Sequence, residues 1–232
     1  MIEVRSRNER GKTRTGWLDS SHTFSFNRYY DPRYMGFRAL RVINEDRVAP
    51  AKGFGTHSHQ NMEILSYVVE GVLEHRDSSG GSGVLGPNEL QRMTAGTGVS
   101  HSEYNPSKTN PTHFLQIWIL PEREGLTPAY EQREFPVSER QERLRLIASR
   151  NGADGSVTIH QDARVYDAII STGVDVTHTL SNQRHAWVQI IKGAIDVNGV
   201  ALQAGDGAAI SEEQSLRIAA TKDAEILLFD LA

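Results

Sequence analysis

Two short clusters of histidine and glutamate are the residues of this chain best suited to bind a metal ion. The first is an H-x-H pair at residues 57–59, and the second is an H-x-E pair at residues 101–103. Side chains two residues apart on a β-strand point to the same face, so each strand can present two ligands to one point. The candidate ligands are His57, His59, His101 and Glu103. Three imidazoles and a carboxylate suit iron, copper, zinc, nickel or manganese.

A chance pair of surface histidines is the simplest alternative explanation of the first cluster, because the chain contains nine histidines. The second cluster follows a glycine-rich turn at residues 96–98 and lies on another apolar segment, which favours a metal site built from two strands over a chance arrangement. The chain has no cysteine, so any metal must be held by nitrogen and oxygen. A structural zinc site usually draws on cysteine and is the less favoured interpretation.

The elements that would position these clusters are β-strands. Short apolar or alternating segments occupy residues 39–43, 64–69, 114–120 and 187–191. Their close spacing, with glycine-rich turns at residues 78–83 and 197–200, is typical of an all-β barrel or sandwich. One short helix is expected at residues 138–143, where a serine can cap the first turn, in the connection between two halves.

The chain also contains an internal repeat. Residues 67–74 (YVVEGVLE) align with residues 189–196 (QIIKGAID), and each segment is followed by a turn. A duplicated barrel explains this match, although a strand-Gly-strand pattern is common enough in β proteins to produce it without duplication. Under the duplication, the four candidate ligands correspond to Thr179, Ser181, Ile218 and Ala220. The second half is therefore expected to hold no metal, and its three histidines, His160, His178 and His185, are interpreted as structural or solvent-facing.

Composition narrows the class of protein. A hydrophobic fraction of 38%, a charged fraction of 23% and a net charge of −4 are typical of a globular protein and argue against a general nucleic-acid binder. The first residues lack the apolar segment of a secretory signal, and no apolar run is long enough to span a bilayer. We therefore expect a cytoplasmic protein, by default a monomer, with no direct nucleic-acid or membrane partner.

Several longer motifs are shared with one family. They are HTFSFNRYYDP at residues 22–32, MGF at 35–37, LRVIN at 40–44, HSHQNME at 57–63 and TAGTGVSHSE at 94–103. In these motifs the chain resembles the pirins, which belong to the cupin superfamily; the second half resembles them more loosely, through residues 154–162. The resemblance implies an all-β bicupin of two antiparallel β-barrel (jelly-roll) domains in tandem. Residues 1–130 would form the metal-binding domain, and residues 131–232 a domain that lacks the ligands.

Motif spacing alone does not identify the fourth metal ligand. The usual first cupin motif, H-x-H-x3-E, is met by His57, His59 and Glu63, so Glu63 competes with Glu103. Both carboxylates have the correct strand parity. The resemblance to pirins favours Glu103 and leaves Glu63 as a carboxylate that supports the site. The chain departs from the cupin pattern at Ala51, where a glycine is usual, and in the turn before the second cluster.

The resemblance also implies a reaction. Bacterial pirins are similar to quercetin 2,3-dioxygenases, which open a flavonol ring with O₂ and release carbon monoxide. This implies a metal-dependent oxidoreductase that acts on a small flavonol-like substrate. It would bind one divalent transition metal, with iron as the first choice and zinc, copper, nickel, manganese or cobalt as alternatives. Glu103 is then the candidate catalytic residue, because it is the one ligand able to take the substrate's hydroxyl proton. The competing hypothesis is a metal- or redox-sensing regulatory protein that binds a transcription factor or a metabolic enzyme.

Overall fold

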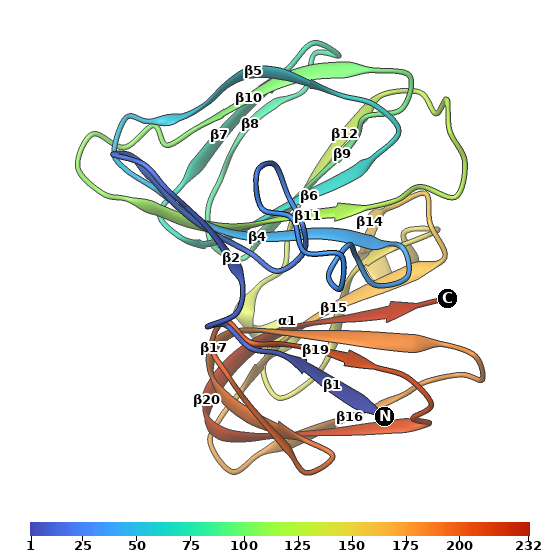
Figure 1. The fold of residues 1–232 in the computed structure, drawn as a ribbon. Coiled ribbons are helices and arrows are strands. Elements are labelled where there is room, and N and C mark those ends of the chain that lie inside the picture. The colour runs from blue at the N-terminus through green and yellow to red at the C-terminus, as the bar shows by residue number, and fades with distance from the viewer. The chain divides into compact units, whose positions relative to one another are not determined.

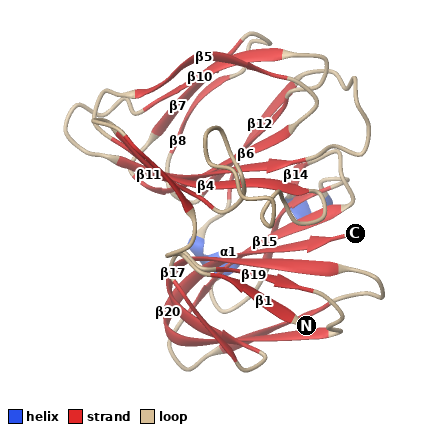
Figure 2. Cartoon of the chain, in the orientation of Figure 1, coloured by secondary structure: helices blue, strands red, loops and turns tan.

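The computed structural model describes all 232 residues, and nearly all of its regular structure is β-strand. The elements are labelled in Figure 1, and Figure 2 distinguishes strand from the two short helical pieces and the loops. The chain divides into two compact units. Unit 1 comprises Met1–Arg10, Phe135–Ser156 and Asp162–Ala232, and unit 2 comprises Gly11–Glu134 and Val157–Gln161. No helix combines the length and the apolar character needed to cross a membrane. The prediction of an all-β protein built from antiparallel sheets is confirmed.

Unit 2 holds both predicted clusters. Its strands are β2 (Gly11–Arg14), β3 (Leu18–His22), β4 (Leu40–Val48), β5 (Gly53–His59), β6 (Glu63–Glu70), β7 (Leu73–Asp77), β8 (Ser82–Leu85), β9 (Glu89–Thr94), β10 (Val99–Tyr104), β11 (Thr112–Ile119), β12 (Ala129–Glu134) and β14 (Val157–Thr158). All of them except β14 form one sheet of order β12-β9-β6-β11-β4-β3-β2 and a second of order β5-β10-β7-β8.

The two sheets of unit 2 contact each other through their inner faces. Strand alternation selects these faces: on β10, Val99, His101 and Glu103 are buried, whereas the residues between them are partly exposed. Part of the interface is an apolar cluster contributed by both sheets, namely Val48, Val68, Leu73, Leu85 and Phe114. Beside it, polar side chains of β10 meet polar side chains of β6 and β11. The interior of unit 2 is therefore part apolar core and part polar site.

Unit 1 has its own strands and both helical pieces. They are β1 (Ile2–Arg5), α1 (Val137–Arg140), β13 (Arg145–Ser149), the 3-10 turn η1 (Ala153–Gly155), β15 (Ala163–Ile170), β16 (Asp175–Thr179), β17 (His185–Val197), β18 (Val200–Gln203), β19 (Gly207–Ile210) and β20 (Ser215–Leu231). The strand order is β1-β19-β17-β20-β15-β13, with β16 paired to β20 and β18 paired to β17.

Unit 1 contains a large apolar core. Strands β17 and β20 pair over most of their length, with register shifts around Lys192 that bend them. Gly193 lies at this bend with φ +75°, and a Cβ there would stand 1.9 Å from the backbone oxygen of Asp223, so the bend requires glycine. The core includes Ile218 and Ala220, two of the positions that the repeat equates with the metal ligands. Ile218 and Ala220 therefore lie in an apolar core, whereas Thr179 and Ser181 are exposed.

Helix α1 is shorter than the predicted segment 138–143. Ser138 lies inside the helix, and the N-cap position is Pro136, which makes no side-chain capping hydrogen bond. The helix ends because Gln141 is extended and Glu142 has φ +56°. The capping prediction was therefore wrong, because a proline that directly precedes the helix takes the N-cap position.

The predicted domains, 1–130 and 131–232, stay a prediction; the two compact units have other bounds, since residues 1–10 lie in unit 1 and residues 131–134 and 157–161 lie in unit 2. Met1–Arg10 belongs to unit 1, since β1 pairs with β19 from Ile2 opposite Ile210 onward. The terminal ammonium also donates to Glu213 at 2.9 Å. A strand of four residues carries no pattern that identifies its partner, which is why sequence reasoning placed it with the following residues.

Candidate metal centre

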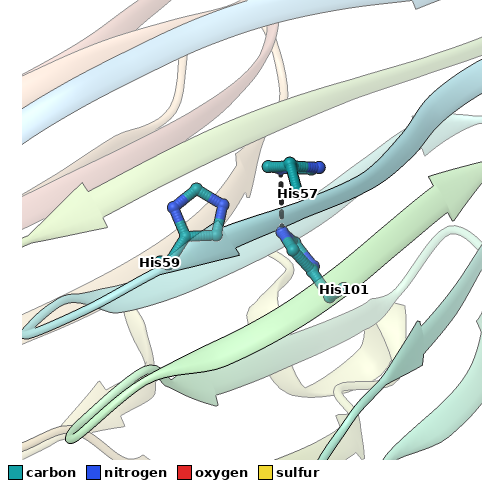
Figure 3. Close-up of side chains that lie close together, drawn as sticks. All are labelled: His57, His59 and His101. Atoms are coloured by element: carbon teal, nitrogen blue, oxygen red, sulfur yellow. Dashed lines mark hydrogen bonds between the residues drawn. The ribbon is translucent and has the colours of Figure 1, made fainter.

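The three candidate histidines converge because β5 and β10 are antiparallel neighbours. Their register sets His101 directly opposite His57, and Val99 opposite His59. Figure 3 shows the three imidazoles turned toward one another, two from β5 and one from β10. The ring of His57 lies 4.8 Å from that of His59 and 4.4 Å from that of His101, centroid to centroid. The ligand atoms of all three side chains lie within 4.8 Å of one another.

The donor atoms fit a divalent transition metal. Nε2 of His57 and Nε2 of His101 are 3.1 Å apart. This separation agrees with the value of about 3.0 Å expected for two nitrogens that each lie about 2.1 Å from one ion, at right angles to each other. The Nδ1 of His57 faces the carbonyl of Gly55 at 2.8 Å, so its proton can donate there and leave Nε2 free to coordinate. Burial, followed by repulsion from the neighbouring imidazoles, lowers the pKa of His59 to about 4 and of His101 to about 3. Both rings are therefore neutral, the form that binds metals.

Glu103 is held between the two sheets. The β5–β10 register shifts between His101 and Glu103, and the Glu103 side chain remains buried. Its Oε1 accepts from Ser66 Oγ at 3.0 Å, and its Oε2 accepts from Gln116 Nε2 at 2.6 Å. The structure places Glu103 in a second potential ligand group with His101 and the buried His75, overlapping the three-histidine group. Its role as the fourth ligand stays a prediction.

The buried His75 contacts His101, and it was not identified from the sequence. Its Nδ1 lies 3.4 Å from Nδ1 of His101, and its Nε2 lies 2.9 Å from Oδ2 of Asp77. Burial opposes ionisation of Asp77, but hydrogen bonds from Ser79, His75 and Gly81 outweigh it and hold its pKa below the ordinary value. An ionised Asp77 accepts the Nε2 proton of His75, so Nδ1 of His75 is an acceptor, and it faces two donors, Gln91 Nε2 at 3.2 Å and Nδ1 of His101. The H-x-D spacing at 75–77, of the same parity as the second cluster, was the available signal.

Glu63 belongs to a different buried network. Its Oε1 lies 3.1 Å from Nδ1 of His160, and its Oε2 accepts from Thr94 Oγ1 at 3.0 Å. Burial raises the pKa of Glu63, against the opposing effects of His160 and Thr94. Glu63 is in neither potential ligand group. In unit 1, His178 pairs with Asp230 at 2.9 Å and so takes part in structure.

A cavity of about 450 Å³ opens beside the three histidines, within the size range of small-molecule sites. Its apolar lining is largely aromatic and comprises Trp17, Leu18, Phe26, Phe54 and Trp118. The Trp118 ring stands edge-on to His59 with centroids 4.9 Å apart. His57, His59 and Glu103 line the same cavity, so a ligand of aromatic character would lie against the proposed ligands.

Asp46 is a second residue of the cavity that sequence reasoning missed. It lies on β4, in the sheet opposite the histidines, and is 4% exposed. Burial raises its pKa to about 7, with a lowering contribution from a Ser20 hydrogen bond and raising contributions from Glu103 and Glu45. Its Oδ1 has no hydrogen-bond partner. The parity of Asp46 with the buried Leu40 and Val42 indicated an inward side chain, but the charged neighbours Glu45 and Arg47 obscured it.

Comparison with known families agrees with the fold. Residues 3–119 match the family model described as Pirin. Residues 146–231 match the model described as a quercetinase C-terminal cupin domain. The chain belongs to the pirin family.

The relatives extend the likeness to the full length. A protein named quercetin 2,3-dioxygenase from Escherichia coli (strain K12) is 49% identical over 231 residues, which cover 100% of this chain and 99% of the relative. The crystal structure of YhhW from Escherichia coli matches with a TM-score of 0.97 at 49% identity, covering 100% of this chain and 98% of the other. The bacterial pirin YhhW in complex with nickel(II), from the same species, matches with a TM-score of 0.95 at 49% identity, covering 100% and 99%.

Proposed function

We propose that this protein is a metal-dependent dioxygenase of the quercetin 2,3-dioxygenase type, which opens a flavonol-type ring with O₂ and releases carbon monoxide. The observation that carries the proposal is the convergence of His57, His59 and His101, two of which, His57 and His59, line an aromatic cavity of about 450 Å³. The name of the Escherichia coli relative at 49% identity supports the same class of reaction.

The metal would be held by the three imidazoles and by the Glu103 carboxylate. A nitrogen- and oxygen-only donor set suits iron, our first choice, as well as nickel, manganese, cobalt, copper or zinc. A related bacterial pirin has been crystallised with nickel(II), which supports a divalent ion here. When bound, such an ion supplies Lewis acidity toward the substrate's hydroxyl group.

The protein's own residues position the substrate and its proton. Trp118 and Phe26, whose rings stand edge-on with centroids 5.4 Å apart, offer apolar surface to an aromatic ring and exclude water. The Glu103 carboxylate lies at the cavity wall, where it can accept the proton of a substrate hydroxyl. Ser66 and Gln116 donate to its two oxygens and fix its orientation.

The test is aerobic turnover of quercetin by protein loaded separately with each candidate metal. We expect carbon monoxide and the depside product from the wild type, and loss of both in His57→Ala and Glu103→Ala. A control variant is His113→Asn, since His113 pairs with Glu45 and takes no part in the cavity lining. Absence of carbon monoxide with every metal, or full activity in the two ligand variants, would contradict the proposal.

A further inference from the structure

Asp46 is an exception among the buried carboxylates of unit 2. Glu63 and Asp77 each have a histidine partner, and Glu103 accepts two hydrogen bonds. Asp46 is just as buried, yet its cross-strand neighbours are Ser20 on β3 and Phe114 on β11, neither of which carries a positive charge. Its Oδ1 is shielded from solvent and has no partner. A buried polar atom without a hydrogen bond is costly to maintain, so a functional reason is expected.

Asp46, the residue that carries this unpartnered oxygen, lines the cavity. Asp46 lines it together with Ser20 and Asn44 from the same sheet, facing the aromatic residues and the histidine cluster. Asn44 is already engaged, because its Oδ1 lies 2.8 Å from Nδ1 of His22. Two cavity-lining residues of this sheet carry a buried polar atom without a partner, Asp46 at Oδ1 and Trp118 at Nε1, and of the two only Asp46 can accept a hydrogen bond from a ligand.

We propose that Asp46 binds a hydroxyl group of the ligand, a second anchor besides the metal centre, and that the cavity selects neutral, ring-shaped molecules carrying at least two hydroxyl groups. A hydroxyl group both donates and accepts, so it satisfies Asp46 whether the carboxyl is ionised or protonated. A ligand carboxylate would place a second negative charge near Asp46 and Glu103 and is disfavoured. The inference deepens the proposed function and rests on it for the position of the metal-bound end of the ligand.

The experiment measures binding under anaerobic conditions with zinc-loaded protein, so that no turnover is needed. The two probes are 3-hydroxyflavone and quercetin, which share the 3-hydroxyl group but differ in the further hydroxyl groups of quercetin. The measured quantity is the ratio of their Kd values. We expect the preference of Asp46→Leu for quercetin over 3-hydroxyflavone to be about tenfold smaller than that of the wild type, because the variant cannot form the hydrogen bond between the Asp46 carboxyl and a ligand hydroxyl group. Asp46→Asn retains an oxygen and a donor, and should stay within about threefold of the wild type.

The control is Glu45→Gln, which removes the same charge from the adjacent residue, whose side chain pairs with Arg47 and His113 and does not line the cavity. It should leave the ratio unchanged. An unchanged ratio in Asp46→Leu, or no binding of either probe by the wild type, would overturn the proposal. If Asp46→Leu fails to fold, Asp46→Ser replaces it and the same ratio decides. Hydroxyl-dependent binding without release of carbon monoxide would keep this assignment and reject the proposed reaction.

Discussion

The arrangement behind His101 predicts that Asp77→Asn weakens metal binding without touching a ligand. Asp77 Oδ1 accepts from the backbone and hydroxyl groups of Ser79 and from the backbone of Gly81, and Oδ2 faces Nε2 of His75. An asparagine that keeps the Oδ1 bonds turns its NH₂ toward His75. His75 must then carry its proton on Nδ1, where it opposes the Nδ1 proton of His101, 3.4 Å away. His101 is pushed toward the tautomer protonated on Nε2, the atom that faces His57.

The expected magnitude follows from this conflict. Loss of a group that orients a metal-ligating histidine typically lowers metal affinity by about 10- to 100-fold, which is about 1.4–2.7 kcal/mol. The assay is competition for zinc or nickel with a chromophoric chelator at fixed pH. Glu74→Gln on the same strand is the control, because Glu74 forms an exposed pair with Arg76, and should change affinity less than twofold.

A second variant separates orientation from loop stability. Ser79→Ala removes the hydroxyl that donates to Asp77 at 2.6 Å and leaves His75 paired. It should lower the unfolding free energy while keeping metal affinity near that of the wild type. Metal affinity of Asp77→Asn within twofold of the wild type, or an equal loss in Ser79→Ala, would refute the tautomer argument.

Three further predictions follow from other parts of the structure. Gly53→Ala should lower metal affinity at least about tenfold, because the added Cβ would stand 2.2 Å from the backbone oxygen of Glu103 and push β5 away from β10. Gly55→Ala is the control in the same chelator assay, since its Cβ would have its nearest contact at 3.8 Å. Arg140→Ala should cost about 3–5 kcal/mol in urea unfolding, since it removes the buried guanidinium that pairs with Asp167 at 2.6 Å and with Glu225 at 3.2 Å. Equal stability of the variant and the wild type would contradict this prediction. In metal-free protein, Asp46→Asn should stabilise the fold more at pH 8 than at pH 4. The reason is that the pKa of Asp46 rises from 3.8 to about 7 on folding, so the stability of the wild type falls as pH rises through that interval. The gain in unfolding free energy should be larger at pH 8 than at pH 4 by up to about 4 kcal/mol, and a gain that does not depend on pH would contradict this.

The parts of the site that could be predicted from sequence are those that depend on local parity. His57 with His59, and His101 with Glu103, share a strand face whatever the fold, and the pirin motifs then indicated that the two strands meet. The antiparallel register that sets His101 opposite His57 is the tertiary fact that sequence could only imply. The apolar residues at the equivalent positions of unit 1 follow the repeat in the same way, with Ile218 and Ala220 in its core.

The residues that were missed depend on pairing between strands distant in sequence. His75 matters because β7 pairs with β10, and Asp46 matters because β4 faces the cavity from the other sheet. Local parity indicates that these side chains point inward, but it does not identify the strand or the cavity that they meet. The placement of β1 is the same case, since its partner β19 lies some two hundred residues away in the chain.

The most direct test of the account is a crystal structure of the metal-loaded protein with anomalous diffraction collected at the absorption edge of the metal. The account expects one ion in each chain, in unit 2, bound by the imidazoles of His57, His59 and His101 and by the carboxylate of Glu103. An ion in the overlapping group of His75, His101 and Glu103, without His57 and His59, would contradict it, and so would an ion in unit 1.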